Sequence, residues 1–226
     1  TNKDENLLKR LTDIYGDNPE ILESRLPLYQ QAVETFINAY GETHEIIISR
    51  APGRINLLGN HIEHRGGYVN YVAVNRETLL VASQREDDRV VIHNANASRF
   101  TPREFSINDL LPPSKRGDWL AYIETLDLPS HDWENYIRAA ILYLQDHFAN
   151  TPIKGLNIAV AGDIPIAAGL SSSSSLVVST LEAALHFNAL EIPHLEKAEF
   201  CGHAEWYAGT RGGAGDHAAM LYAQQQ

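Results

Sequence analysis

The sequence predicts a fold of the α+β class, and three observations support this. Segments rich in β-branched residues and segments with helical periodicity both occur, but they do not alternate regularly, which argues against a doubly wound parallel sheet. The chain has 226 residues, of which 44% are hydrophobic and 21% charged, so it can bury a substantial core. No internal repeat is present, which argues against a solenoid or propeller.

Helices and strands can be placed in order along the chain. Apolar residues at helical spacing predict a helix from Pro19 to about Ala39, which Gly41 closes and which Pro27 either kinks or divides. A β-branched strand over 45–49 is expected to break at 51–53, where proline and glycine follow it. The remaining expectations are strands over 68–83, 89–93 and 156–161, a turn over 94–98, a helix that starts at Asp132 or Asn135, a helix from the serines through Leu190, and a helix over 196–207.

Charge and cysteine content exclude several classes of function. The formal net charge of −11 argues against a general surface for nucleic acids or anionic membranes. The single cysteine, Cys201, cannot form an intramolecular disulfide and fits a reducing compartment. No apolar run of about 18 residues occurs, and residues 1–5 lack the apolar core of a signal peptide. We therefore expect a cytoplasmic protein with no nucleic-acid partner and no membrane partner.

A glycine-bounded loop that runs into five serines is the most informative segment. Gly162 ends an expected strand, Gly169 and Leu170 close the loop, and the serines 171–175 open an expected helix. Such a loop presents unpaired backbone N–H groups at a positive helix end, and serine hydroxyls add donors, so the segment suits a nucleotide phosphate. No lysine follows the glycine, so it is not a G-x-x-x-x-G-K-[ST] loop. A flexible Ser-rich linker is the alternative, but the apolar runs on both sides argue against it.

A second polar segment lies between Arg50 and Tyr68. It crowds arginine, asparagine, histidine and glutamate side chains between glycine-flanked turns. Polar side chains at that density suit a hydroxyl-rich ligand, because each can donate to or accept from an OH group. A metal site at His61, Glu63 and His64 is the less favoured interpretation, since the spacing is not a usual helix-borne ligand pattern.

The third segment, 209–217, is glycine-rich and ends at Asp216. Glycines before Asp216 allow its carboxylate to approach a bound ligand closely, and Glu205 precedes the segment. A plain structural interpretation is that Asp216 caps the helix that follows. The two interpretations are compatible.

Together these segments resemble the GHMP kinase superfamily and, within it, the galactokinase branch. Residues 50–69 look like the galactokinase signature R-A-P-G-R-V-N-L-I-G-E-H-T-D-Y-x-G-G, and residues 162–174 look like the phosphate loop P-x-x-x-G-L-x-S-S-A. Residues 133–137 are similar to the W-x-N-Y-[VI] helix start, and residues 205–217 resemble the segment A-G-x-x-C-G-I-M-D-Q. The four matches occur in the family's order, and the resemblance as a whole runs from about residue 16 to the end.

The resemblance implies an ATP-dependent, Mg²⁺-dependent sugar kinase with two domains and an active site in the cleft between them. Residues 1–226 would form the N-terminal domain, a ribosomal protein S5 domain 2-like mixed sheet packed with helices, and the chain's own C-terminal domain would complete the cleft. The likeness also implies roles for individual residues. The ATP phosphates would be held by Gly169, Leu170, Ser171, Ser172, Ser173 and Ser174, and Trp133 would lie near the adenine and ribose. The metal would be bound by Ser173 and Glu205, and the catalytic residues would be Arg54 and Asp216. The sugar would be bound by Arg54, Asn60, His61, Glu63, Gly213 and Asp216.

Several departures from the family pattern bear on the choice of sugar. Asn60 replaces a glutamate, Glu63 an aspartate, His64 a tyrosine, and Arg211-Gly212 a Pro-Cys pair. Galactose, converted to galactose 1-phosphate, is the first expectation, and L-arabinose, L-fucose or a uronic acid are the alternatives. A galactokinase-like sensor without turnover is a different class, but such a protein would not need Arg54, Glu205 and Asp216 together. Whether Asp216 takes the hydroxyl proton or only positions the hydroxyl stays open, since a neighbouring arginine makes a carboxylate a weaker base.

Overall fold

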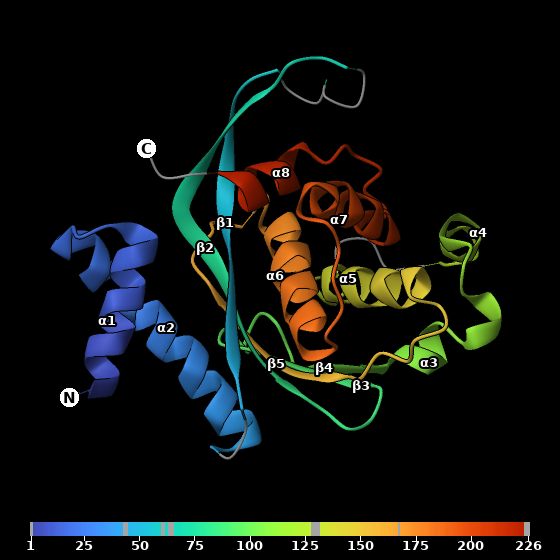
Figure 1. The fold of residues 1–226 in the computed structure, drawn as a ribbon, viewed down its shortest axis with the longest axis horizontal. Coiled ribbons are helices and arrows are strands. Elements are labelled where there is room, and N and C mark those ends of the chain that lie inside the picture. Colours follow the sequence, from blue (N-terminus) through green and yellow to red (C-terminus); the bar gives the residue numbers. More distant parts are fainter. Residues whose placement is uncertain are drawn as a thin grey trace.

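A five-stranded mixed sheet lies between two layers of helices (Figure 1). The structure is a computed structural model that describes residues 2–42, 45–59, 62, 66–127, 132–166 and 168–223, the side chains of residues 2–7 excepted. The strand order is β1-β2-β5-β3-β4, in which only the β5–β3 pair is parallel. The strands are β1 (Ile47–Leu58), β2 (Asn70–Gln84), β3 (Arg89–Asn94), β4 (Arg103–Ser106) and β5 (Leu156–Gly162). The predicted α+β class is confirmed.

Helices α1 (Asn2–Tyr15) and α2 (Pro19–Tyr40) cover one face of the sheet. Leu79 and Val81 of β2 point toward them and join a core with Phe36, which is 1% exposed. Asn18 caps α2 by accepting hydrogen bonds from two backbone N–H groups, and Gly41 ends it at a φ of 87°. Pro27 lies inside α2 without ending it.

The larger core lies on the opposite face. The alternate residues Leu80 and Ala82 of β2 point to this side, as a strand period of two requires. Helices α5 (Glu134–His147), α6 (Ser172–Phe187), α7 (Lys197–Glu205) and α8 (Gly215–Tyr222) pack here, and their apolar side chains close the core around α6. Short segments complete the chain: α3 (Ile107–Leu110), α4 (Trp119–Glu124) and the 3₁₀ turns η2 (Pro113–Lys115), η3 (His194–Glu196) and η4 (Trp206–Ala208).

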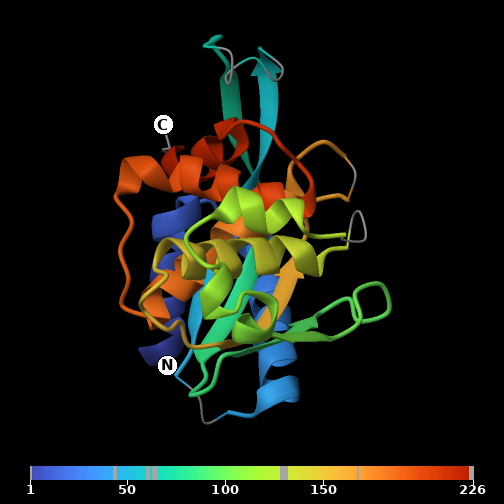
Figure 2. The same cartoon turned by 90° about the vertical axis from the view of Figure 1, so that its right-hand side faces the viewer.

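The predicted break of the first strand at residues 51–53 is wrong. Strand β1 continues through Pro52 and Gly53, with an irregularity in register between Pro52 and Arg54. It lies at the edge of the sheet, where a proline costs no hydrogen bond to a second neighbouring strand, and the irregularity absorbs the glycine. The ends of β1 and β2 project beyond the helices as a long ribbon (Figure 2).

Other predicted boundaries differ from the structure by a few residues. Helix α6 ends at Phe187 rather than Leu190, because Asn188 caps it through its backbone N–H. The last predicted helix divides into α7 and η4, since the chain tightens after Glu205. Helix α1 and strand β4 were not predicted. Among the described residues, none of the helices is long and apolar enough to span a membrane.

Candidate active site

The serine loop has the backbone of an anion-binding helix start. Strand β5 ends at Gly162, Gly169 has a φ of 71°, and Ser171 adopts the left-handed conformation with a φ of 57° immediately before α6. Left-handed backbone is uncommon for a serine and concentrates at functional sites. The side chain of Ser171, the N-cap of this 16-residue helix, makes no capping hydrogen bond, so the first-turn N–H groups of α6 are not capped by it and can donate to a ligand.

Strand β1 holds this loop directly. The Arg54 N–H donates to the Leu170 carbonyl at 3.1 Å, and a Cβ on Gly53 would stand 3.1 Å from the same oxygen. Gly53 therefore permits a close approach of the two backbones, which a larger residue would push apart.

Arg54 joins the loop to the third predicted segment. Its Nε and Nη2 donate to the two carboxylate oxygens of Asp216 at 2.7 and 2.6 Å, and its Nη1 donates to the Gly169 carbonyl at 2.6 Å. The Ser171 hydroxyl also donates to Asp216, at 2.5 Å. The bidentate pair is strong and geometrically specific, and it fixes the Asp216 carboxylate at the mouth of the loop.

The helix-cap interpretation of Asp216 is not what the structure shows. Ala214 is the N-cap of α8, and Asp216 is the second helical residue. Its carboxylate contacts Arg54 and Ser171 instead of the first-turn N–H groups of α8. The side chain is thus directed across the site.

Glu205, at the end of α7, forms a second polar cluster beside the loop. The Ser174 hydroxyl donates to Glu205 Oε2 at 2.9 Å, and His217 Nε2 lies 2.8 Å from the same oxygen. All three side chains are buried. Sequence reasoning paired Glu205 with Ser173, whereas its nearest serine hydroxyl is that of Ser174.

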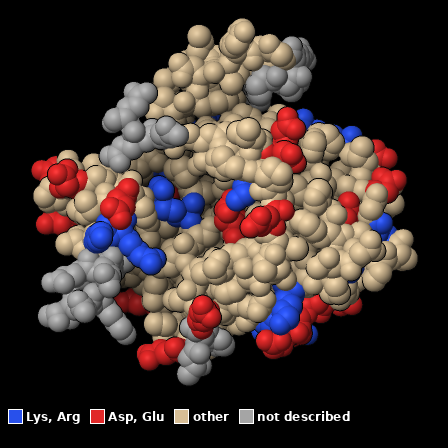
Figure 3. Space-filling view, in the orientation of Figure 1, with Lys and Arg blue, Asp and Glu red and all other residues tan. Residues whose placement is uncertain are grey.

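Two hollows meet at the serine loop. A cavity of about 240 Å³ is lined by Arg54, Glu205 and Asp216, together with the loop serines and Gly213. A larger cavity of about 620 Å³ lies on the other side of the loop, toward Trp133. Ser173 lines both. Acidic and basic side chains meet in a hollow near the middle of the face drawn in Figure 3.

Aromatic and amide side chains line the larger cavity. Trp133 and Phe100 lie there with ring centroids 5.5 Å apart, alongside Tyr136. Asn94 and Asn96 supply amide groups at the same wall. Flat apolar walls with a few polar groups suit a heterocyclic base. Trp133 was predicted near the adenine and ribose, whereas Asn94, Asn96 and Phe100 were not, because residues 94–98 carry only the pattern of a turn.

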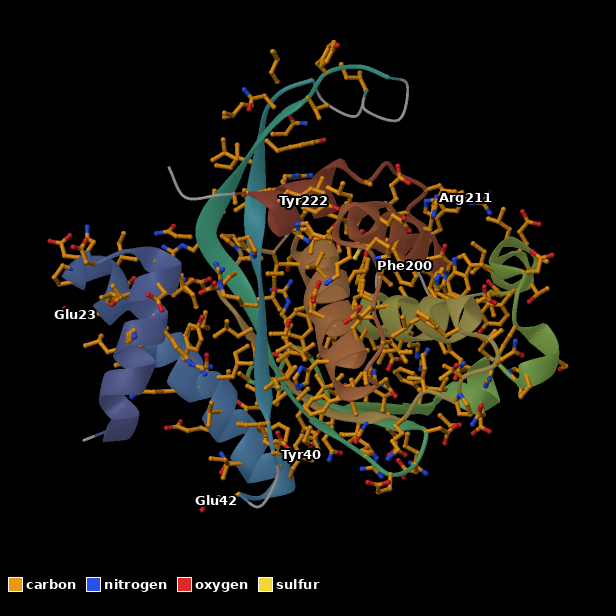
Figure 4. The ribbon with its side chains drawn as sticks, viewed as in Figure 1. Glu23, Tyr40, Glu42, Phe200, Arg211 and Tyr222 are labelled. Atoms are coloured by element: carbon orange, nitrogen blue, oxygen red, sulfur yellow. The ribbon has the colours of Figure 1, made fainter. Side chains whose placement is uncertain are left out.

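Not every predicted sugar-site residue can be placed. Asn60, His61, Glu63 and His64 lie outside the described residues, so the metal interpretation of 61–64 is untested as well. Arg211 (labelled in Figure 4) lies on the segment between α7 and α8 and does not line the small cavity. Its guanidinium is 3.7 Å from the Glu124 carboxylate.

A buried ion network supports the loop from behind. Asp163, the first residue after β5, is 2.8 Å from Arg25 of α2 and 2.9 Å from Arg76 of β2, and it accepts from the Glu77 N–H at 2.8 Å. Burial alone would raise the pKa of Asp163, but these hydrogen bonds together lower it. The carboxylate of Glu77 is fully buried and pairs with Arg50 at 2.7 Å.

The small cavity fits a magnesium–phosphate complex by its donor chemistry. Mg²⁺ takes oxygen ligands, usually one or two carboxylates together with phosphates and water. Glu205 and Asp216 supply carboxylates, and the loop supplies hydroxyls. Hydrogen bonds within the described chain reach only Oε2 of Glu205, so Oε1 remains available to a ligand.

Two family profiles match the chain on these segments. The GHMP kinases N terminal domain matches residues 135–224, which include the serine loop and Asp216, and the galactokinase galactose-binding signature matches residues 34–84, which include Arg54. Residues 135–224 therefore have the sequence pattern of a GHMP kinase N-terminal domain. The resemblance noted from the motifs is confirmed.

Galactokinases are among the proteins to which this chain is similar. It is 31% identical to the galactokinase of Dictyostelium discoideum over 97% of its own length and 41% of that protein, and 30% identical to that of Lactococcus lactis subsp. cremoris over 84% and 44%. The crystal structure of Lactococcus lactis galactokinase complexed with galactose superposes with a TM-score of 0.72 at 28% identity, covering 87% of this chain and 47% of that one. A mevalonate kinase, 21% identical with a TM-score of 0.60, shares the fold. The chain thus spans less than half the length of these galactokinases.

Proposed function

We propose that the protein containing this chain transfers the γ-phosphoryl group of ATP to a hydroxyl of a monosaccharide, with galactose as the first candidate. One observation carries the proposal: the serine loop lies between a base-sized cavity and a small polar cavity that holds the Arg54–Asp216 pair. A nucleoside on one side and an acceptor hydroxyl on the other would meet at the loop. Similarity to galactokinases, one of them solved with galactose, supports the choice of sugar.

The chain's own residues would act mainly by positioning and by neutralising charge, which is what phosphoryl transfer asks of a protein. The N–H groups and hydroxyls of Ser171–Ser174 bind the phosphates, and Trp133 lies against the nucleoside. Arg54 is directed by its bidentate bond and offers positive charge at the reacting phosphoryl group. Glu205 and the Ser173 hydroxyl would hold Mg²⁺, which would supply positive charge to neutralise the phosphates.

Asp216 orients the acceptor hydroxyl, whose oxygen forms a bond to the γ-phosphorus while the bond from that phosphorus to the ADP oxygen breaks. The hydroxyl proton leaves to Asp216 or to water. Arg54 and Ser171 donate to the oxygens of Asp216 and so fix the orientation of its carboxylate before substrate binds. The geometry therefore favours orientation as its main contribution.

The substitutions at Asn60 and Glu63 favour testing other sugars beside galactose. Rejection of an analogue that leaves a buried polar group unpaired can reach about 10⁴-fold, so a few altered hydrogen-bonding residues can change the substrate. The experiment is a panel of monosaccharides, uronic acids included, with ADP release measured for the full-length protein. A sugar-dependent rate supports the kinase, and binding of both ligands without turnover supports a sensor.

Replacing Glu205 with glutamine should raise the Mg²⁺ concentration that half-saturates turnover in the full-length protein. The amide keeps the size of the side chain and still accepts from Ser174, but it removes the negative charge that a hard cation needs. Glu23→Gln, an exposed change on α2 (Figure 4), is the control. An unchanged Mg²⁺ dependence in Glu205→Gln removes this residue from the metal site.

The 226-residue chain alone should be inactive, because we infer that a C-terminal domain supplies the other wall of the active-site cleft. The galactokinase relatives are more than twice as long as the part this chain matches. Turnover with ATP and the best sugar should be undetectable for the isolated chain and present in the full-length protein. Comparable rates in the two proteins would contradict a shared active site.

A further inference from the structure

Two consecutive residues of α8 serve opposite sides of the small cavity. Neighbouring residues on a helix point about 100° apart. Asp216 accordingly reaches Arg54 and Ser171, whereas His217 reaches Glu205. The start of one helix thus fixes both carboxylate clusters, and the role of His217 is not covered by the function proposed above.

His217 is the basic side chain that contacts the buried carboxylate of Glu205. Glu205 is 5% exposed and His217 is 2% exposed. Within the described residues, no lysine or arginine lies within 4 Å of the Glu205 carboxylate, and His217 is the basic side chain that does. A buried carboxylate is costly unless polar groups surround it. His217 and the Ser174 hydroxyl are those groups.

The contact defines which atoms carry the interaction. His217 Nε2 lies 2.8 Å from Glu205 Oε2, so the polar edge of the imidazole faces this carboxylate oxygen. The geometry of this contact is not that of an aligned hydrogen bond. The attraction between the imidazole and the carboxylate is therefore electrostatic. Nδ1 is buried without a hydrogen-bond partner in the described chain. The imidazole therefore has one polar contact, and it is Glu205.

We propose that His217 is a positioning residue for nucleotide-bound Mg²⁺. It holds Oε2 of Glu205, jointly with Ser174, and so fixes the carboxylate orientation that leaves Oε1 for the metal. This rests on the proposed function, in which Glu205 is a metal ligand. Groups that hold a ligating carboxylate in place commonly contribute about 10- to 100-fold to metal affinity.

The test compares His217→Gln, His217→Asn and His217→Leu in the full-length protein. A glutamine amide can place its nitrogen near the position of Nε2, an asparagine amide is too short to do so, and leucine removes the polar contact. Calorimetry without sugar gives the Kd of ATP with Mg²⁺ and the Kd of ATP with EDTA. The ratio of the Kd with EDTA to the Kd with Mg²⁺ isolates the metal contribution from nucleotide binding and from overall stability.

The ratio should fall about 10-fold or more in His217→Leu and His217→Asn and recover in His217→Gln, with the EDTA value unchanged. Equal ratios in all three variants and the parent would overturn the proposal, as would a recovery in His217→Asn but not in His217→Gln. If His217→Leu does not fold, the comparison of His217→Gln with His217→Asn decides. If Glu205→Gln loses the Mg²⁺ effect while the His217 variants keep it, the proposed function stands and the role of His217 falls. If the parent protein shows no Mg²⁺ effect, both fall.

Discussion

Replacing Asp216 with asparagine should lower kcat by about 10²–10⁴ while the fold and the affinity for ATP are retained. Asparagine keeps the size of the side chain and can still accept from Arg54, but it loses the charge and the ability to take a proton. Asp216 is bound by Arg54 at both oxygens and by Ser171. Steady-state kinetics of the full-length protein, with ATP binding measured separately, tests this.

Asp109→Asn is the matched control, since Asp109 is exposed on α3 and lines neither cavity. It should leave kcat unchanged. Thermal melting of both variants separates a loss of chemistry from a loss of fold. An Asp216→Asn protein with the parent's kcat would show that this carboxylate acts only on Arg54 and the loop, as a structural group.

Replacing Glu77 with leucine should destabilise the protein by about 3–5 kcal/mol, because removing one partner of a buried ion pair leaves the other charge uncompensated. Glu77 has no exposed surface, and it accepts from Arg50 at 2.7 Å and from the Tyr15 hydroxyl. Arg25 lies 3.9 Å away. Burial and the hydrogen bond to Glu77 also raise the pKa of Tyr15, so this tyrosine stays a neutral donor.

The exposed pair Lys154–Glu86 supplies the control for Glu77. Its charged atoms are 2.9 Å apart, close to the Arg50–Glu77 distance, but Glu86 is 91% exposed. Glu86→Leu should change the free energy of unfolding by about 1 kcal/mol or less. Urea unfolding of the full-length protein compares the two, and equal shifts would contradict the importance of the buried network. Arg25 contacts both Glu77 and Asp163, and Asp163 is the first residue after β5, where the serine loop begins. Glu77→Leu should therefore also weaken the binding of ATP by the loop.

Local patterns predicted the strand, loop and helix start of the serine loop because their causes are local. Gly162, Gly169 and the serines determine a strand end, a left-handed turn and a helix start within a few residues of one another. The α2 helix was predicted to within a residue or two for the same reason, since Asn18 and Gly41 cap it.

Long-range features could not be predicted from local patterns. Whether proline interrupts β1 depends on that strand's place at the sheet edge, which only the assembled sheet defines. Arg54 and Asp216 are 162 residues apart, and their pairing was expected only through the family resemblance. The contact of His217 with Glu205 was missed altogether, although a histidine directly after a site aspartate at a helix start is a usable signal.

A crystal structure of the full-length protein with Mg²⁺, a non-hydrolysable ATP analogue and the preferred sugar tests the account most directly. We expect the phosphates at Ser171–Ser174, the base in the cavity beside Trp133 and the acceptor hydroxyl within hydrogen-bond distance of Asp216. Phosphates bound away from the serine loop, or a sugar hydroxyl out of reach of Asp216, would contradict it.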